Sequence, residues 1–210
     1  MNLDLEKIEP PKRSGNEQFH AGGEAQDFSV LDFWRWSASD LLENTARGVL
    51  AEYLVARALG ISTEGVREEW GSFDLASDGG LKIEVKSAAY LQSWGQKKLS
   101  VIAFRVPRHQ GWNAQRGEYN PEVKRHADVY VFALLAHRDK RTVDPLDVEQ
   151  WRFYVLPAGV LNRRERSQHS ITLRSLEAVA GPGVGFHGLR ESVERIAREH
   201  GLPPLQRPSP

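Results

Sequence analysis

The sequence contains no cysteine among its 210 residues. It therefore forms no disulfide, offers no thiol nucleophile and binds no zinc through thiolates. Long apolar runs are also missing, because the longest, Val129 to Ala136, is far shorter than the roughly 20 residues that a membrane helix needs. The first residues carry acids and no apolar stretch, so they do not resemble a signal peptide. These absences predict no membrane partner and favour a reducing, cytoplasmic setting.

An excess of charge of one sign is lacking as well, since 28 Lys and Arg residues balance 28 Asp and Glu residues. A nucleic-acid partner must therefore be bound by a local basic patch rather than by the whole surface. The length suits one compact domain, which we expect over residues 27–200. Polar or proline-rich sequence predicts a flexible N-terminal arm, 1–26, and a flexible C-terminal tail, 201–210.

Apolar periodicity and turn residues predict an α/β fold. Residues 40–59 repeat apolar side chains at helical spacing, with Asp40 and Glu43 as a capping box and Gly60 as the stop. Residues 28–36 are expected to form a short helix or strand that covers the core, and 107–125 a long polar loop. Further strands and a final amphipathic helix are expected at 73–76, 81–87, 99–106, 127–135, 151–156 and 188–199. This order predicts a mixed β-sheet flanked by helices.

Four charged residues form the pattern that points to chemistry. Glu84 and Lys86 are two residues apart in one predicted strand, so they share a face. Asp74 precedes a Ser-Asp-Gly-Gly turn, across which antiparallel pairing would bring it beside Glu84. Glu52 lies on or beside the apolar stripe of the first helix, where a carboxylate is costly unless it is paired or bound to metal. Converging carboxylates suit Mg²⁺, and a neighbouring ammonium can orient a water.

The order of these residues resembles that of the PD-(D/E)xK nuclease superfamily, which includes many restriction and repair nucleases. The resemblance covers about residues 40–106 and rests on Glu52, Asp74, Glu84 and Lys86, although Phe73 stands where the motif has proline. It implies a restriction-endonuclease-like core and an endonuclease acting on DNA, with RNA left open. It also implies that the three acids bind Mg²⁺, for which Mn²⁺ would substitute, and that the lysine assists the attacking water.

A second Glu-Val-Lys sequence, at 122–124, shows how much of the pattern depends on context. It follows Asn120-Pro121, a turn signal, and lacks an acid on a preceding hairpin strand. For the first copy the alternative is a solvated strand face with cross-strand charge pairs. Two other functions therefore stay open: a catalytically inactive nucleic-acid-binding module with the same fold, and a scaffold subunit of a larger complex.

Basic residues gather after the predicted site. From Lys86 to Arg125 the chain carries eight basic and two acidic residues. This excess predicts contacts with phosphates, the alternative being an ordinary solvated loop. A homodimer through 28–36 or 188–199 is expected if both DNA strands are cut, because one site cuts one strand. The candidate nucleic-acid-binding residues are Gln92, Lys97, Lys98, Arg105, Arg108 and Arg116, with a structural role for Gln92 as the alternative.

Overall fold

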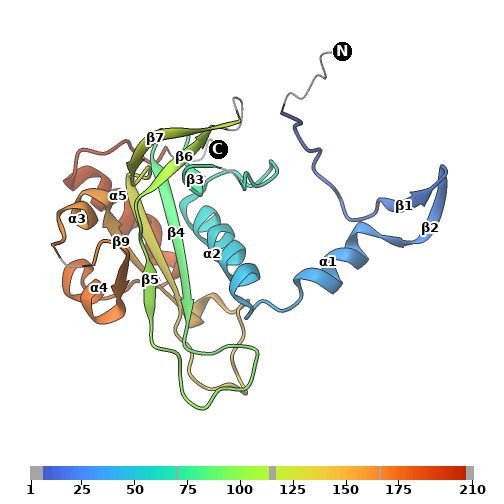
Figure 1. The fold of residues 1–210 in the computed structure, drawn as a ribbon. Helices are drawn as coiled ribbons and strands as arrows, with labels where there is room; N and C mark the ends of the chain where they lie inside the picture. Colours follow the sequence, from blue (N-terminus) through green and yellow to red (C-terminus); the bar gives the residue numbers. More distant parts are fainter. Residues whose placement is uncertain (1–6, 70, 114–116, 166, 207–210) are drawn as a thin grey trace.

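A four-stranded mixed sheet forms the centre of the computed structural model, which describes residues 7–69, 71–113, 117–165 and 167–206 (Figure 1). The strand order is β3-β4-β8-β9. The two central strands, β4 (Lys82–Ala89) and β8 (Val129–Leu135), are parallel. The outer strands, β3 (Leu75–Ala76) and β9 (Trp151–Pro157), run antiparallel to their neighbours.

Helices cover both faces of this sheet. On one face α2 (Asn44–Leu59) and α5 (Leu189–Glu199) pack their apolar residues against the sheet. On the other face α3 (Ala158–Arg163) and α4 (Leu173–Ala180) close a second apolar cluster. Every residue of β8 is buried, as expected for a strand covered on both sides. The predicted α/β class, a mixed sheet flanked by helices, is confirmed.

The remaining strands form three small pairs outside the central sheet. β5 (Ala103–Arg105) pairs with β10 (Ser170–Thr172). β6 (His109–Asn113) and β7 (Glu118–Lys124) form a hairpin, so the prediction of a long loop over 107–125 is wrong. All residues of β7 are exposed, and a strand without a buried face shows no alternation of apolar and polar residues. Two short 3-10 helices directly precede other elements in the chain: η1 (Val148–Gln150) precedes β9, and η2 (Phe186–Gly188) precedes α5.

The N-terminal region carries more regular structure than the flexible arm that the sequence predicted over residues 1–26. β1 (Gln18–Ala21) and β2 (Glu24–Ser29) form a hairpin that projects away from the sheet (Figure 1). Its turn consists of Gly22 and Gly23, whose φ angles of 59° and 89° suit a two-residue hairpin turn. The glycines that suggested a flexible arm are thus the residues that allow the hairpin.

The aromatic segment 28–36 does not cover the core, contrary to its prediction. Its residues end β2 and form most of α1 (Val30–Ala38), which starts at a capping box. α1 buries none of its residues, and Phe33, Trp34 and Trp36 are exposed. The next helix also begins later than predicted: Glu43, rather than Asp40, caps α2.

The C-terminal tail, expected to be flexible over 201–210, forms no helix or strand as far as it is described, but it packs against the domain. Leu205 is buried in the same cluster as α2 and α5. The Pro204 carbonyl accepts a hydrogen bond from the Ser77 hydroxyl at 3.2 Å, and Arg190 donates to the carbonyl of Gln206 at 3.1 Å. Residues 207–210 lie outside the described residues. Within the described part of the chain, no helix has the length and apolar character to cross a membrane.

Candidate active site

Asp74 is fixed at the point where the chain enters the short strand β3. Its backbone N–H donates to the carbonyl of Ile83 at 3.1 Å. Its carboxylate Oδ2 accepts a hydrogen bond of 2.7 Å from the backbone N–H of Val85. The turn between β3 and β4 closes with a 2.8 Å bond from Gly80 to Ser77, and Gly80 has a φ of 86°. The hairpin that the sequence predicted therefore places Asp74 beside β4.

Glu84 and Lys86 lie on the opposite face of β4 from the side chains that pack against α2. Ile83 and Val85 belong to the apolar cluster under α2. Lys86 Nζ donates to Glu84 Oε1 at 2.5 Å, and the Glu84 side chain is almost fully buried. Neighbouring β8 places Tyr130 in register with Glu84. Burial, followed by the negative charge of Glu84, raises the pKa of the Tyr130 hydroxyl, which therefore keeps its proton at neutral pH.

The electrostatics of Asp74 show that the two acids share one environment. Burial raises the pKa of the Asp74 carboxyl, and the charge of Glu84 raises it further. The charge of Lys86, the Val85 amide and the charge of Arg67 act in the opposite direction. The partly buried Asp74 and the buried Glu84 repel each other and form a set of hard oxygen donors whose charge a divalent cation would offset. This donor chemistry fits Mg²⁺ or Mn²⁺.

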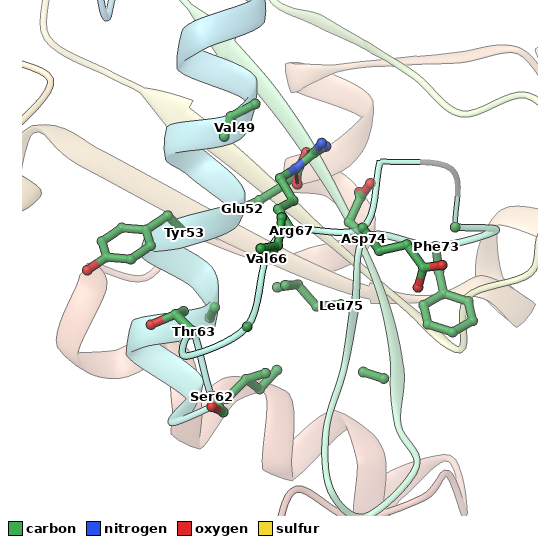
Figure 2. Close-up of a pocket in the computed structure, with 16 residues that line it drawn as sticks. Val49, Glu52, Tyr53, Ser62, Thr63, Val66, Arg67, Phe73, Asp74 and Leu75 are labelled. Carbon is green, nitrogen blue, oxygen red and sulfur yellow. Dashed lines mark hydrogen bonds and ion pairs between the residues drawn. The ribbon is translucent and has the colours of Figure 1, made fainter. Parts of the chain in front are cut away.

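Glu52 on α2 shares a cavity with Asp74, but it is engaged by another residue. Its two carboxylate oxygens accept hydrogen bonds from Arg67 Nε and Nη2, at 2.5 and 2.8 Å. Glu52, Arg67 and Asp74 line one cavity of about 430 Å³ between α2 and the segment that leads into β3 (Figure 2). Among the described residues, no three His, Asp or Glu side chains are close enough together to hold one ion. The structure thus brings together Asp74, Glu84 and Lys86, with Glu52 nearby and paired to Arg67.

Two residues of this region were not predicted from the sequence. Arg67 lies in a polar segment between Val66 and two further acids, where nothing in the spacing indicates a contact with α2. Tyr130 lies within the apolar run of β8 and reads as an ordinary core residue. Both contacts depend on the tertiary structure: the pairing of β4 with β8 places Tyr130 beside Glu84, and the path of the irregular segment after α2 brings Arg67 to Glu52.

The candidate nucleic-acid-binding residues lie in different surroundings. Gln92 is buried and accepts a 3.4 Å hydrogen bond from Arg47, whose guanidinium also donates to Ser87 at 3.1 Å. It therefore supports the end of β4 from inside. Arg125, counted in the basic excess, is buried too and donates to the carbonyl of Val106. The four exposed candidates are Lys97, Lys98, Arg105 and Arg108.

These four exposed side chains do not belong to one segment. Lys97 and Lys98 follow the carboxyl end of β4, whereas Asp74 lies beside its beginning. Arg105 ends β5, and Arg108 immediately precedes the β6–β7 hairpin. Figure 1 shows the loop after β4 and the β6–β7 hairpin at opposite ends of that strand. Arg116, the sixth candidate, lies outside the described residues.

A comparison with protein-family models matches residues 25–175 to bacteriophage T4 endonuclease IV. The match covers well over half of the chain and includes all four residues of the predicted site. The chain belongs to the bacteriophage T4 endonuclease IV family. It is thus a member of a nuclease family, which agrees with the class of protein that the sequence predicted. A search of curated proteins finds no match.

The part of the chain shared with the endonuclease IV family contains the whole central sheet. The match begins within β2 and ends within α4, so it spans α2 and the strands from β3 to β10. α5, which completes one apolar cluster, lies beyond it. The candidate site therefore lies entirely within the part that defines the family.

Proposed function

We propose that this protein is a Mg²⁺-dependent endonuclease that hydrolyses phosphodiester bonds in DNA at a PD-(D/E)xK-type site. One observation carries the proposal: Asp74 is held by the Val85 amide while Glu84 and Lys86 project from the same stretch of β4. Membership of the endonuclease IV family supports the nuclease activity. The assignment to the PD-(D/E)xK superfamily rests on the order and placement of the four charged residues.

Asp74 and Glu84 are the proposed ligands of the ion, and Glu52 would complete the site. Two protein carboxylates suffice for Mg²⁺, which usually keeps several waters and also binds substrate phosphates. When bound, such an ion polarises a phosphoryl oxygen and lowers the pKa of a bound water. Mn²⁺ should substitute because it accepts the same oxygen ligands.

Lys86 has two proposed roles that follow from its place on the strand. Its ammonium orients the Glu84 carboxylate through the 2.5 Å contact. Its side chain is also partly exposed, which makes the ammonium accessible to substrate. In that position it would orient the attacking water and stabilise the negative charge that develops on the phosphoryl group.

The test compares Asp74→Asn with Asp78→Asn, the same chemical change four residues along the chain. Asp78 is exposed in the turn between β3 and β4, outside the proposed site. Cleavage of DNA in Mg²⁺ should fall at least about 100-fold in Asp74→Asn and stay unchanged in Asp78→Asn. Full activity in excess EDTA, or an active Asp74→Asn protein, would refute the proposal. DNA binding without cleavage in Mg²⁺ or Mn²⁺ would favour the catalytically inactive binding module. Cleavage of RNA but not of DNA would show that RNA is the substrate.

We also infer that cleavage of both DNA strands would be carried out by a homodimer, because one site cuts one strand and a double-strand break needs two copies. Of the two surfaces predicted for it, α5 packs its apolar face on the sheet, whereas α1 exposes Phe33, Trp34 and Trp36. A second copy of the chain would therefore contact α1. Light scattering should show a dimer for the wild type and a lower mass for Trp36→Lys. A monomer at all concentrations, with and without DNA, would contradict this inference.

A further inference from the structure

The Glu52–Arg67 pair occupies the cavity wall beside Asp74. Arg67 contacts both carboxylate oxygens of Glu52, in the two-pronged arrangement that is the strongest form of an arginine–carboxylate pair. The Glu52 side chain is 13% exposed and that of Arg67 is 37% exposed. Figure 2 shows the two end groups meeting next to Asp74. An ion that binds Glu52 through the oxygen lone pairs facing Arg67 must therefore displace the guanidinium from at least one oxygen.

Arg67 interacts electrostatically with two of the acids that line the cavity, Glu52 and Asp74. The hydrogen bonds that Arg67 donates to Glu52 raise the pKa of the guanidinium, and the charges of Glu52 and Asp74 raise it further. Arg67 in turn partly offsets the burial that raises the pKa of Asp74. The guanidinium thus supplies, in the structure as it stands, part of the positive charge that a divalent ion would supply.

Arg67 belongs to a segment whose ends pack against the apolar clusters through Ile61 and Phe73 but whose middle is attached by surface contacts. Between α2 and β3, residues 61–69 and 71–74 form no helix or strand. Glu68 pairs with Lys7 at 3.5 Å, and Glu64 pairs with Lys12 at 3.3 Å. Exposed ion pairs of this kind contribute little stability. Arg67 can therefore change partner without disturbing the apolar core.

We propose that Arg67 is a positioning residue that couples metal binding to DNA binding. This inference rests on the function proposed above. Arg67 holds Glu52 in the metal-free protein, releases one or both oxygens when a divalent ion binds, and then donates to a DNA phosphate. A phosphate offers the guanidinium the same paired acceptors as a carboxylate. Each ligand therefore favours the binding of the other, as linkage requires.

The first measurement is calorimetric titration of Mn²⁺ into the DNA-free protein. Arg67→Gln should bind Mn²⁺ about two- to fivefold more tightly than the wild type, because the competing ion pair is gone. Arg195→Gln is the matched control: Arg195 pairs with Glu199 on α5, outside the cavity, and its loss should leave Mn²⁺ affinity unchanged. Arg67→Lys keeps the positive charge but loses the guanidinium that contacts both Glu52 oxygens. Its Mn²⁺ affinity should therefore lie between those of the wild type and Arg67→Gln.

A double-mutant cycle separates competition for Glu52 from simple repulsion between Arg67 and the ion. In a Glu52→Gln background, Arg67→Gln should change Mn²⁺ affinity much less than it does beside Glu52. An equal change in both backgrounds would mean that Arg67 merely repels the ion, and the competition would be refuted.

The second measurement is Ca²⁺ affinity with and without a short DNA oligonucleotide, since Ca²⁺ is expected to support cleavage poorly. DNA should tighten Ca²⁺ binding in the wild type, and this effect should shrink about fivefold in Arg67→Gln. Arg67→Gln could instead lower the melting temperature while leaving both the metal affinity and the effect of DNA on Ca²⁺ affinity unchanged. Arg67 would then have a purely structural role, and the inference would be overturned. A wild type that binds no Mn²⁺ would refute the metal site itself. Mn²⁺ bound through Asp74, with no response to Arg67→Gln, would refute only the role of Arg67.

Discussion

Glu84-Val85-Lys86 and Glu122-Val123-Lys124 are the same tripeptide in two strands of one molecule. In both, the lysine Nζ donates to the glutamate at 2.5 Å. The surroundings differ: Val85 is 6% exposed and Val123 is 56% exposed, while the two glutamate side chains are 10% and 60% exposed. β4 has a strand on each side and helices on both faces, whereas β7 pairs only with β6 among the described residues. Spacing along a strand therefore creates the ion pair, and the neighbouring elements decide whether that pair is buried or exposed.

The acid across the hairpin is the second difference between the copies. The backbone N–H of Val85 donates to the Asp74 carboxylate. β7 is paired instead with β6, whose residues opposite Val123 and Lys124 are Gln110 and His109. Neither of these side chains carries a second carboxylate. The proposed chemistry depends on this difference, which the following changes are designed to test.

The largest effect is expected from Glu84→Gln against Glu122→Gln. Loss of the charge of a proposed metal ligand beside Asp74 should reduce cleavage at least about 100-fold, while the same change in β7 should leave the rate unchanged. Single-turnover cleavage in saturating Mg²⁺ measures this. Circular dichroism must show both proteins folded, and equal loss of activity in the two variants would contradict the comparison.

Lys86→Ala against Lys124→Ala should show the next largest effect. Removing Lys86 should lower the cleavage rate about 10- to 100-fold with a smaller change in DNA affinity, because its charge is needed as negative charge develops. Lys124→Ala should alter the salt dependence of binding by at most one phosphate contact and leave the rate intact. Binding isotherms at several salt concentrations, alongside single-turnover rates, distinguish the two. A Lys86→Ala protein that only binds DNA less well would assign that lysine to substrate binding.

Val85→Ala against Val123→Ala compares the two strands through stability. Deleting buried methyl groups at Val85 should lower the free energy of unfolding by about 1–2 kcal/mol. The same deletion at exposed Val123 should change it by less than about 0.5 kcal/mol. Urea denaturation of the metal-free proteins gives both values. Similar losses would show that the hairpin contributes to the core as much as the central sheet does.

The smallest effect expected is the pH dependence caused by Asp74. Its pKa is raised in the folded protein, so the folded state binds more protons than the unfolded state above the ordinary value of 3.8. Without metal, its contribution to stability falls as pH rises through the window between the ordinary and the raised pKa. Asp74→Asn should therefore gain melting temperature relative to the wild type as pH rises through that window. Mg²⁺ should narrow this difference in melting temperature by stabilising the wild type. A difference that stays constant with pH in the absence of metal would refute the raised pKa of Asp74.

Much of the fold was predictable because several segments carry patterns that neighbouring elements do not alter. The continuous apolar run at 129–136 predicted the buried central strand β8. The spacing of Leu189, Val193 and Ile196 predicted α5, in which all three side chains are buried. The β6–β7 hairpin was missed because its second strand has no buried face and contains Pro121. The packing of the tail was not predicted, because the burial of Leu205 depends on contacts with distant elements. α3, α4 and β10 were not predicted either, being short elements whose packing partners lie far along the chain.

The sequence by itself determined the two-residue spacing of Glu84 and Lys86 and the turn that sets Asp74 opposite β4. These are local properties, fixed by the period of a strand and by glycine at the turn. The tertiary structure alone decided that one Glu-Val-Lys copy is buried and the other exposed, and that Arg67 engages Glu52. Both outcomes depend on which distant segments pack together, because burial and ion pairing are set by neighbours in space.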